Sequence, residues 1–159
     1  MPGWARMGSK PVDPRTRMAG YGVALLRVVL GVVFLMHGYL ALVVVGPGGF
    51  ESYAARMGYP VALAPFLAWY LIVAHLVGGA LLVLGLWTRT AALVQVPIMA
   101  SALFLLHFGQ GFFLRGIVLD QAAGRVMVGG AEYDLLVLAA AVTLGLTGGG
   151  VLALDGRRG

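Results

Sequence analysis

The chain has 159 residues, of which 60% are hydrophobic and 11% charged, and its mean hydropathy is +0.94. Soluble domains carry about 25% charged residues, so this composition excludes an ordinary soluble protein and indicates one that lies in a membrane. The formal charge of +5 does not indicate nucleic-acid binding, because the basic residues lie in tails and loops beside apolar runs, and the lack of cysteine excludes disulfide, iron–sulfur and thiolate–metal chemistry by this chain itself.

The N-terminal region predicts a solvated tail followed by a membrane helix. Residues 1–19 are basic and contain three prolines, and the first span is predicted over 21–45. Its apolar run is too long and continuous for a cleaved signal peptide, so we expect a retained signal-anchor helix. Arg27, near the start of the run, has a stem long enough to carry its charge back to the interface. The Gly46-Pro47-Gly48-Gly49 run ends the span, and the loop from 46 to 60 is expected to lie in water.

The middle of the chain predicts two further spans joined by a tight turn. They cover 62–86, ending next to Trp87, and 91–108. Because so few residues connect them, the two helices are expected to be antiparallel neighbours. Pro97 lies inside the third span and should kink it and free a backbone carbonyl that needs another partner.

The C-terminal third predicts a long connection and a short last span. Residues 117–119 and 126–128 are expected to form a small hairpin within the connection. A fourth span is predicted over 132–148, with 156–159 as a second tail; its strictly apolar part is short for a bilayer. Glycine and alanine recur where helices would need to approach closely, among them Gly31, Gly79 and Gly145.

These elements predict an all-α integral membrane protein, a bundle of four transmembrane helices in one domain over 20–155. Lys and Arg on the side of the termini are Arg6, Lys10, Arg15, Arg17, Arg27, Arg89, Arg157 and Arg158, against Arg56, Arg115 and Arg125 on the other side. This asymmetry predicts that both termini are cytoplasmic.

The three histidines are the first candidates for chemistry. From the helical rise, His37 lies roughly 12 Å deep, His75 near the midplane and His107 near the outer end of its helix. Ionisable side chains in a bilayer usually face the protein interior. Three functional interpretations are open: a quinone hydrogen-bonded by histidine, a proton relay, or a pair of haem or metal ligands. The alternative is that each neutral imidazole bonds a carbonyl or hydroxyl across a helix interface.

Two further groups of side chains have both a functional and a structural interpretation. Glu132 and Asp134 open the fourth helix, where carboxylates favour the helix N-terminus; Glu132 is also placed to exchange protons with His107 at the outer surface. Aromatic residues gather toward the outer half, either as an interfacial belt or as a flat pocket for a quinone ring. The residues considered for that pocket are Tyr39, Trp69 and Tyr70. No phosphate-loop, zinc-protease or serine-hydrolase motif is present.

Several segments resemble the DoxX family of small four-helix bacterial membrane proteins. They are LRVVLGVVFLMHG at 26–38, GGALLVLGLWTR at 78–89, His107 with GFF at 111–113, GGAE at 129–132, and LALD at 152–155. The resemblance spans about residues 20–155. It implies a multi-pass protein of the bacterial inner (plasma) membrane that is associated with redox enzymes and related to the small subunit of thiosulfate:quinone oxidoreductase.

The sequence departs from the family pattern at two places. Members often carry a lysine a few residues after the His-Gly of the first helix, where this chain has Tyr39-Leu40-Ala41-Leu42. They often carry a glutamate before the Gly-Gly of the second, where this chain has His75, which keeps a titratable group there.

The leading hypothesis is a membrane subunit of a redox complex that contacts a quinone, with His37, His75 and His107 lining a polar interior and Glu132 at its outer mouth. No metal is expected, and the electron carrier would belong to a protein partner, because the chain has no cluster motif. The alternative is a structural or assembly subunit of a larger respiratory or photosynthetic complex, and a small transporter is a third hypothesis. Lipid and protein partners, or a homo-oligomer, are expected in each case.

Overall fold

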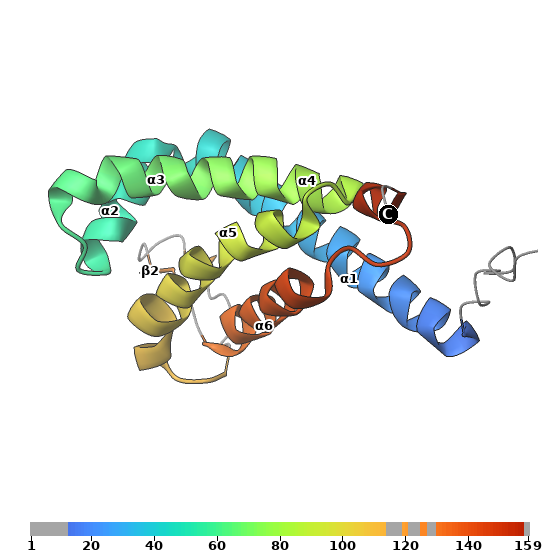
Figure 1. The fold of residues 1–159 in the computed structure, drawn as a ribbon. Helices are drawn as coiled ribbons and strands as arrows, with labels where there is room; N and C mark the ends of the chain where they lie inside the picture. The colour runs from blue at the N-terminus through green and yellow to red at the C-terminus, as the bar shows by residue number, and fades with distance from the viewer. Residues whose placement is uncertain (1–12, 114–118, 121–124, 127–129, 158–159) are drawn as a thin grey trace, which may run out of the picture.

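A computed structural model describes residues 13–113, 119–120, 125–126 and 130–157 of the chain. Within these residues the protein is made of helices and a single pair of two-residue strands (Figure 1). Fold class is therefore all-α, as the sequence predicts.

The first helix is longer than expected at its N-terminus. Helix α1 (Pro14–Tyr39) continues directly into the π-helix η1 (Leu40–Val45). Asp13 caps it, because its carboxylate accepts a hydrogen bond of 3.1 Å from the backbone N–H of Arg15, and Pro14 suits a first helical position. The combined length is about 48 Å, which exceeds a hydrocarbon core of about 30 Å. Its first turns project beyond the other helices (Figure 1).

The segment predicted as a loop between the first two spans contains a helix instead. Gly46 has a positive φ of 76° that turns the chain, and Pro47 then begins α2 (Pro47–Arg56). Phe50 and Ala54 are one turn apart on the side of α2 that packs against the following helix, where Phe50 is half-buried and Ala54 is buried. The polar composition of the segment does not indicate this packing.

The second and third helical rods are each built of several segments. One rod runs through η2 (Val61–Leu63), α3 (Ala64–Val73), the π-helix η3 (Ala74–Gly78) and α4 (Gly79–Leu84). The other runs through α5 (Thr88–Ser101), the π-helix η4 (Ala102–His107) and η5 (Phe108–Gln110). The turn between them uses left-handed conformations at Gly85 and Trp87.

The connection after the third rod contains the predicted hairpin in its described part. Strand β1 (Leu119–Asp120) pairs antiparallel with β2 (Arg125–Val126), with Leu119 opposite Val126. The remaining residues predicted for this hairpin lie outside the described part of the chain. Helix α6 (Glu132–Thr147) and the 3-10 turn η6 (Leu154–Arg157) complete the fold.

Three helices, rather than the four expected, are long and apolar enough to cross a membrane within the described residues. They are Pro14–Val45, Val61–Leu84 and Thr88–Gln110. Helix α6 has only 16 residues, because Gly148, with a φ of +83°, ends it. At 1.5 Å per residue it extends about 24 Å, short of a hydrocarbon core of about 30 Å. The orientation of the termini stays a prediction.

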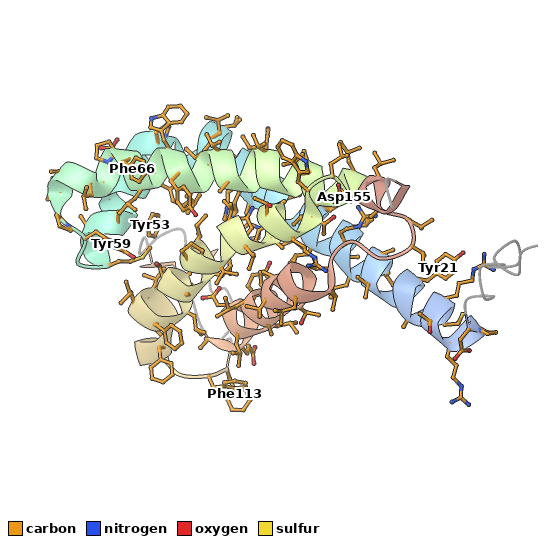
Figure 2. The ribbon with its side chains drawn as sticks, in the orientation of Figure 1. Tyr21, Tyr53, Tyr59, Phe66, Phe113 and Asp155 are labelled. Atoms are coloured by element: carbon orange, nitrogen blue, oxygen red, sulfur yellow. The ribbon has the colours of Figure 1, made fainter. Side chains whose placement is uncertain are left out.

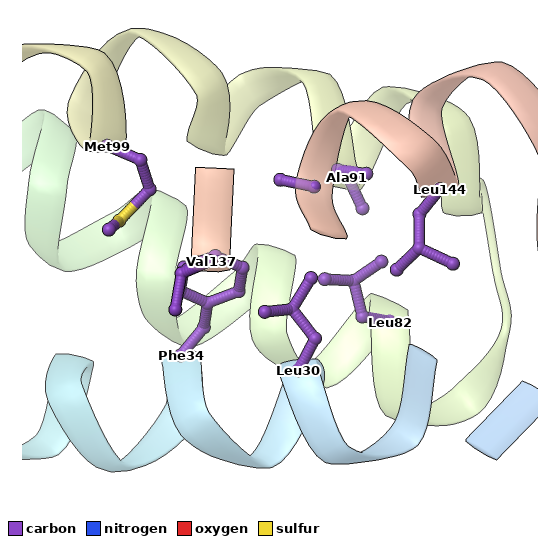
Figure 3. Close-up of a cluster of buried hydrophobic side chains, with 9 residues drawn as sticks. Leu30, Phe34, Leu82, Ala91, Met99, Val137 and Leu144 are labelled. Carbon is purple, nitrogen blue, oxygen red and sulfur yellow. The ribbon is translucent and has the colours of Figure 1, made fainter. Parts of the chain in front are cut away.

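The core lies where these helices meet. Phe34 and Leu30 of α1 lie beside Leu82 of α4, with Met99 of α5 and Val137 of α6 facing them (Figure 3). Many large apolar side chains point outward instead, such as Val29, Phe66 and Phe104. An outward apolar surface is expected where lipid is the solvent.

Helices α1 and α4 cross at two glycines. A Cβ atom added at Gly79 would lie 2.8 Å from the backbone nitrogen of Leu35 and 2.9 Å from the carbonyl oxygen of Gly31. Both neighbours are backbone atoms, which cannot rotate aside. The small residues noted in the sequence therefore allow this close approach.

The C-terminal segment 148–155, which we call the C-terminal clasp, joins α1 to the turn between α4 and α5. The Arg27 guanidinium is 2% exposed and donates hydrogen bonds to the carbonyls of Leu82 and Val83 in α4, at 2.6 and 3.1 Å. It also donates to the carbonyls of Gly149 and Leu152 in the clasp, at 3.1 and 3.3 Å. Backbone carbonyls at the end of α4 and in the clasp therefore surround this charge, and its level relative to the membrane interface stays a prediction.

Asp155 completes the clasp from the other side of the turn (Figure 2). Its carboxylate accepts hydrogen bonds from the backbone N–H groups of Trp87 and Thr88, at 2.8 and 2.9 Å. These groups open α5 and have no partner within that helix, so the carboxylate caps it and meets the positive end of its dipole.

Candidate functional site

Side chains from three helices form an aromatic and imidazole cluster that reaches from the protein surface to the buried His75. The ring of His37 in α1 lies 6.5 Å from that of His75 in η3, measured between centroids. On its other side, His37 stacks on Tyr133 of α6, with 6.2 Å between centroids. We call His37, His75 and Tyr133 the imidazole cluster.

His75 is the buried member of the cluster. It is 5% exposed, and the edge-on ring of Phe34 lies 5.1 Å from it. Its Nδ1 atom is shielded from solvent and makes no hydrogen bond of normal geometry within the described part of the chain, although the ring interacts with the backbone of Leu71 one turn earlier. A buried polar atom in this state has capacity for a further partner.

The π-helical turn η3 positions His75. In this turn the carbonyl of Ala74 accepts a hydrogen bond of 2.6 Å from Nε2 of the fully buried Gln95 in α5. Gly78 leaves room for that amide, because a Cβ there would lie 2.6 Å from it. Single π-helical turns occur often at functional sites.

His37 has a defined tautomer when it is neutral. Its Nδ1 lies 2.9 Å from the carbonyl oxygen of Val33, which can only accept, so Nδ1 carries the hydrogen. Nε2 of the neutral ring is then left with a lone pair. The side chain is exposed at the protein surface, so this nitrogen can be reached from outside the core.

His107 and Asp134 form a hydrogen-bonded pair near the imidazole cluster. Nδ1 of His107 contacts a carboxylate oxygen of Asp134, and the two side chains are 14% and 8% exposed. Nε2 of His107 is buried without a hydrogen-bond partner among the described residues. Asp134 follows Tyr133 in the first turn of α6, so the pair and the cluster meet at this helix end.

The structure places the predicted site residues in three locations. His37 and His75 come together, whereas His107 pairs with Asp134; Glu132, the carboxylate expected beside it, is half-buried at the start of α6. The aromatic residues lie outside both groups. Tyr39 and Trp69 are about half exposed on the outer surface, and Tyr70 donates a hydrogen bond of 2.7 Å to the carbonyl of Val94.

Tyr70 therefore serves the proline kink. Pro97 lies inside α5, and Val94 is one turn before it, so the phenol satisfies a carbonyl of the turn that the proline disturbs. The carbonyl that loses its helical N–H partner to the proline is that of Leu93, four residues earlier, so the partner expected for that carbonyl stays a prediction. No group of three His, Asp or Glu side chains suited to a metal ion occurs among the described residues.

We predict that the His107–Asp134 pair is energetically coupled. Leucine at each position and at both gives a double-mutant cycle, with unfolding followed by thermal or denaturant melts in detergent. A partly buried hydrogen bond involving a charged group contributes about 1.5–3 kcal/mol, so a coupling free energy in this range is expected. Strictly additive losses would show that the contact has no role in stability.

Three membrane-competent helices, with His75 buried beside the surface-exposed His37, define a multi-pass integral membrane protein with a polar site at a helix interface. The chain matches the DoxX family over residues 22–108, which include the first three helices and both histidines of the imidazole cluster. The protein belongs to the DoxX family.

One curated relative supports the same assignment over a longer range. The chain is 31% identical over 134 residues to the protein described as "Putative oxidoreductase CatD" from Bacillus subtilis (strain 168), and the match covers 84% of each chain. A match of this length must extend past residue 108, where the family match ends, into the C-terminal third of this chain. No solved structure matches the chain.

Proposed function

We propose that this DoxX protein is the membrane subunit of a quinone-linked oxidoreductase, in which the imidazole cluster binds a quinone head group and exchanges protons with it. The observation that carries the proposal is the arrangement of two imidazoles 6.5 Å apart across a pair of membrane helices, the exposed ring of His37 and the buried ring of His75, whose Nδ1 has no hydrogen-bond partner of normal geometry among the described residues. A polar atom without a partner is costly in a membrane, so it indicates a site that binds a ligand or exchanges a proton.

The residues fit a quinone as a substrate in chemical terms. Quinone oxygens accept hydrogen bonds, and the oxygens of a reduced quinol donate them. Nε2 of neutral His37 accepts a proton from a quinol hydroxyl, and the protonated ring returns one to a quinone oxygen. Tyr133, stacked on the same ring, provides a flat surface against which an aromatic head group packs.

The His107–Asp134 pair provides a route for the proton beyond the cluster. Nδ1 of His107 contacts a carboxylate oxygen of Asp134, so one proton can be passed between these two atoms. We place this pair and Glu132 at the outer mouth of the site. Electrons would then come from or pass to a partner protein, since this chain has no cysteine with which to hold an iron–sulfur cluster.

The proposal includes a topology. Helix α6 packs along α5 and contacts α1, so we place it across the bilayer as a fourth, short membrane helix with both termini cytoplasmic. Its length of about 24 Å is then accommodated by its neighbours and by local thinning of the bilayer. Labelling of single cysteines introduced at Ser9 and Ser52 tests this orientation from opposite sides of intact cells.

The test of the proposed function is quinone affinity in variants of the cluster. His37→Leu and His75→Leu are each expected to weaken quinone binding about tenfold or more in proteoliposomes, because each removes a hydrogen bond to the head group, equivalent to about 1.5 kcal/mol. Gln95→Leu is the matched control. It removes a buried polar side chain of α5 whose amide bonds the carbonyl of Ala74, so it should lower thermal stability more than it lowers quinone affinity.

The same variants distinguish the structural alternative. If His75→Leu leaves quinone affinity and electron transfer unchanged but prevents co-purification of partner proteins, the chain is an assembly subunit. Equal loss of affinity in Gln95→Leu would instead show that the effect is due to general loosening of the helices.

A further inference from the structure

An apolar pocket lies away from the imidazole cluster, between α2, α3 and the Pro97 region of α5. It encloses about 160 Å³. Phe50, Ala54 and Met57 form one wall from α2 and its end, while Leu71 of α3 and Ile98 of α5 face them. Tyr53 and Tyr59 mark this end of the molecule (Figure 2).

Three of the hydroxyl groups that line the pocket, those of Ser101, Tyr59 and Tyr70, are hydrogen-bonded to protein atoms. Ser101 donates to the carbonyl of Pro97 at 2.8 Å, so Tyr59, whose oxygen lies 2.8 Å from that of Ser101, donates to the serine. Tyr70 donates to Val94. The carbonyls of Val94 and Pro97 thereby have side-chain donors, and most of the remaining lining is hydrocarbon and aromatic ring. This chemistry suits a hydrocarbon chain.

Position and size indicate which hydrocarbon would enter. Leu67 and Leu71 lie six and ten residues after Val61, where the second rod begins, so the pocket lies roughly 9–15 Å along that rod. This depth is within one leaflet of a hydrocarbon core of about 30 Å. An apolar cavity of about 150 Å³ stays dry and admits a molecule the size of benzene, so this pocket suits a stretch of roughly six carbons.

The pocket adjoins a lipid-facing groove. Tyr70 lines it and also lines a second apolar groove with Phe66, Trp69 and Val73, of which the last three are exposed. On a membrane-spanning helix these exposed side chains face the bilayer. A hydrocarbon chain of the bilayer therefore lies next to the pocket.

We propose that the pocket between α2, α3 and α5 holds one acyl chain of a membrane phospholipid, with α2 as its cover. This site is separate from the imidazole cluster and does not depend on the proposed function. It would fix α2 against the second and third helices, since the chain would contact all three.

Photochemical labelling tests the proposal. The full-length protein is reconstituted with a phospholipid that carries a diazirine on an acyl chain, irradiated, and mapped by mass spectrometry. Labels are expected to concentrate on Leu67, Leu71 and Ile98. Ala54→Leu and Ala102→Leu fill the pocket from opposite walls and should each lower that labelling about tenfold, the ratio that corresponds to 1.4 kcal/mol.

Ala55→Leu is the matched control, because Ala55 is exposed and adjacent to Ala54 in the same helix. It should leave the labelling unchanged. If one pocket variant fails to fold, the other gives the result from the opposite wall. Even labelling along the helices, or labelling unaffected by the folded variants, would overturn the proposal, as would displacement of the label by an excess of an isoprenoid quinone, which would identify a quinone tail as the occupant.

Discussion

Arg27→Met is expected to destabilise the protein by about 3 kcal/mol or more, measured as the free energy of unfolding in mild detergent. The guanidinium donates to four backbone carbonyls from α4 and the C-terminal clasp. Methionine has a similar stem but no donor, and a buried polar group left unpaired costs about 1–3 kcal/mol. Since several carbonyls lose their partner together, the loss should exceed that of a single hydrogen bond.

Two further substitutions define the cause of that effect. Arg27→Lys keeps the charge, but a single ammonium cannot reach all the carbonyls in the same fork geometry, so an intermediate loss is expected. Arg17→Met removes an exposed arginine from the first turns of the same helix and should change stability by less than about 0.5 kcal/mol. Equal losses for Arg17→Met and Arg27→Met would contradict the clasp as the source of stability.

Gly79→Leu should separate α1 from α4 and cost about 3 kcal/mol, the upper part of the range for overpacking. A first side-chain carbon at this position already lies within 2.9 Å of backbone atoms of α1. Because the clash involves backbone, the helices must move apart, and the contact between His37 and His75 across the same interface would lengthen. The measurement is a thermal melt combined with size-exclusion chromatography.

Gly22→Leu is the control for Gly79→Leu. No atom lies within 4 Å of a Cβ added at Gly22, and this position is also helical and exposed. Leucine there should stabilise α1 by up to about 1 kcal/mol through helix propensity alone. A loss at Gly22 as large as that at Gly79 would mean that steric crowding between the helices does not explain the effect.

The sequence predicts the helical class, the family and three membrane helices, because long apolar runs have few alternative structures. It also locates the close approach of α1 and α4 through glycines and the need for a carbonyl partner near Pro97. These are local or compositional features. What the sequence did not predict depends on tertiary burial. Helix α2 forms in a segment of mixed polarity because Phe50 and Ala54 pack against the second rod.

The candidate site shows the same division. The three histidines are recognisable as intramembrane ionisable residues, but their partners depend on which helix face is buried. Asp134, rather than Glu132, lies on the face of α6 that continues through Val137, Ala141 and Leu144, all buried. That helical spacing is visible in the sequence and would have favoured Asp134 as the partner of His107. The stacking of Tyr133 on His37 has no comparable signal.

The most direct test of the central claim is the quinone content of the protein purified from its native membrane in mild detergent. We expect about one quinone per chain, a co-purifying redox protein, and loss of the quinone in His75→Leu while the protein stays folded. A folded native preparation without quinone or a redox partner, held instead in a larger complex, would contradict the claim and identify a structural subunit.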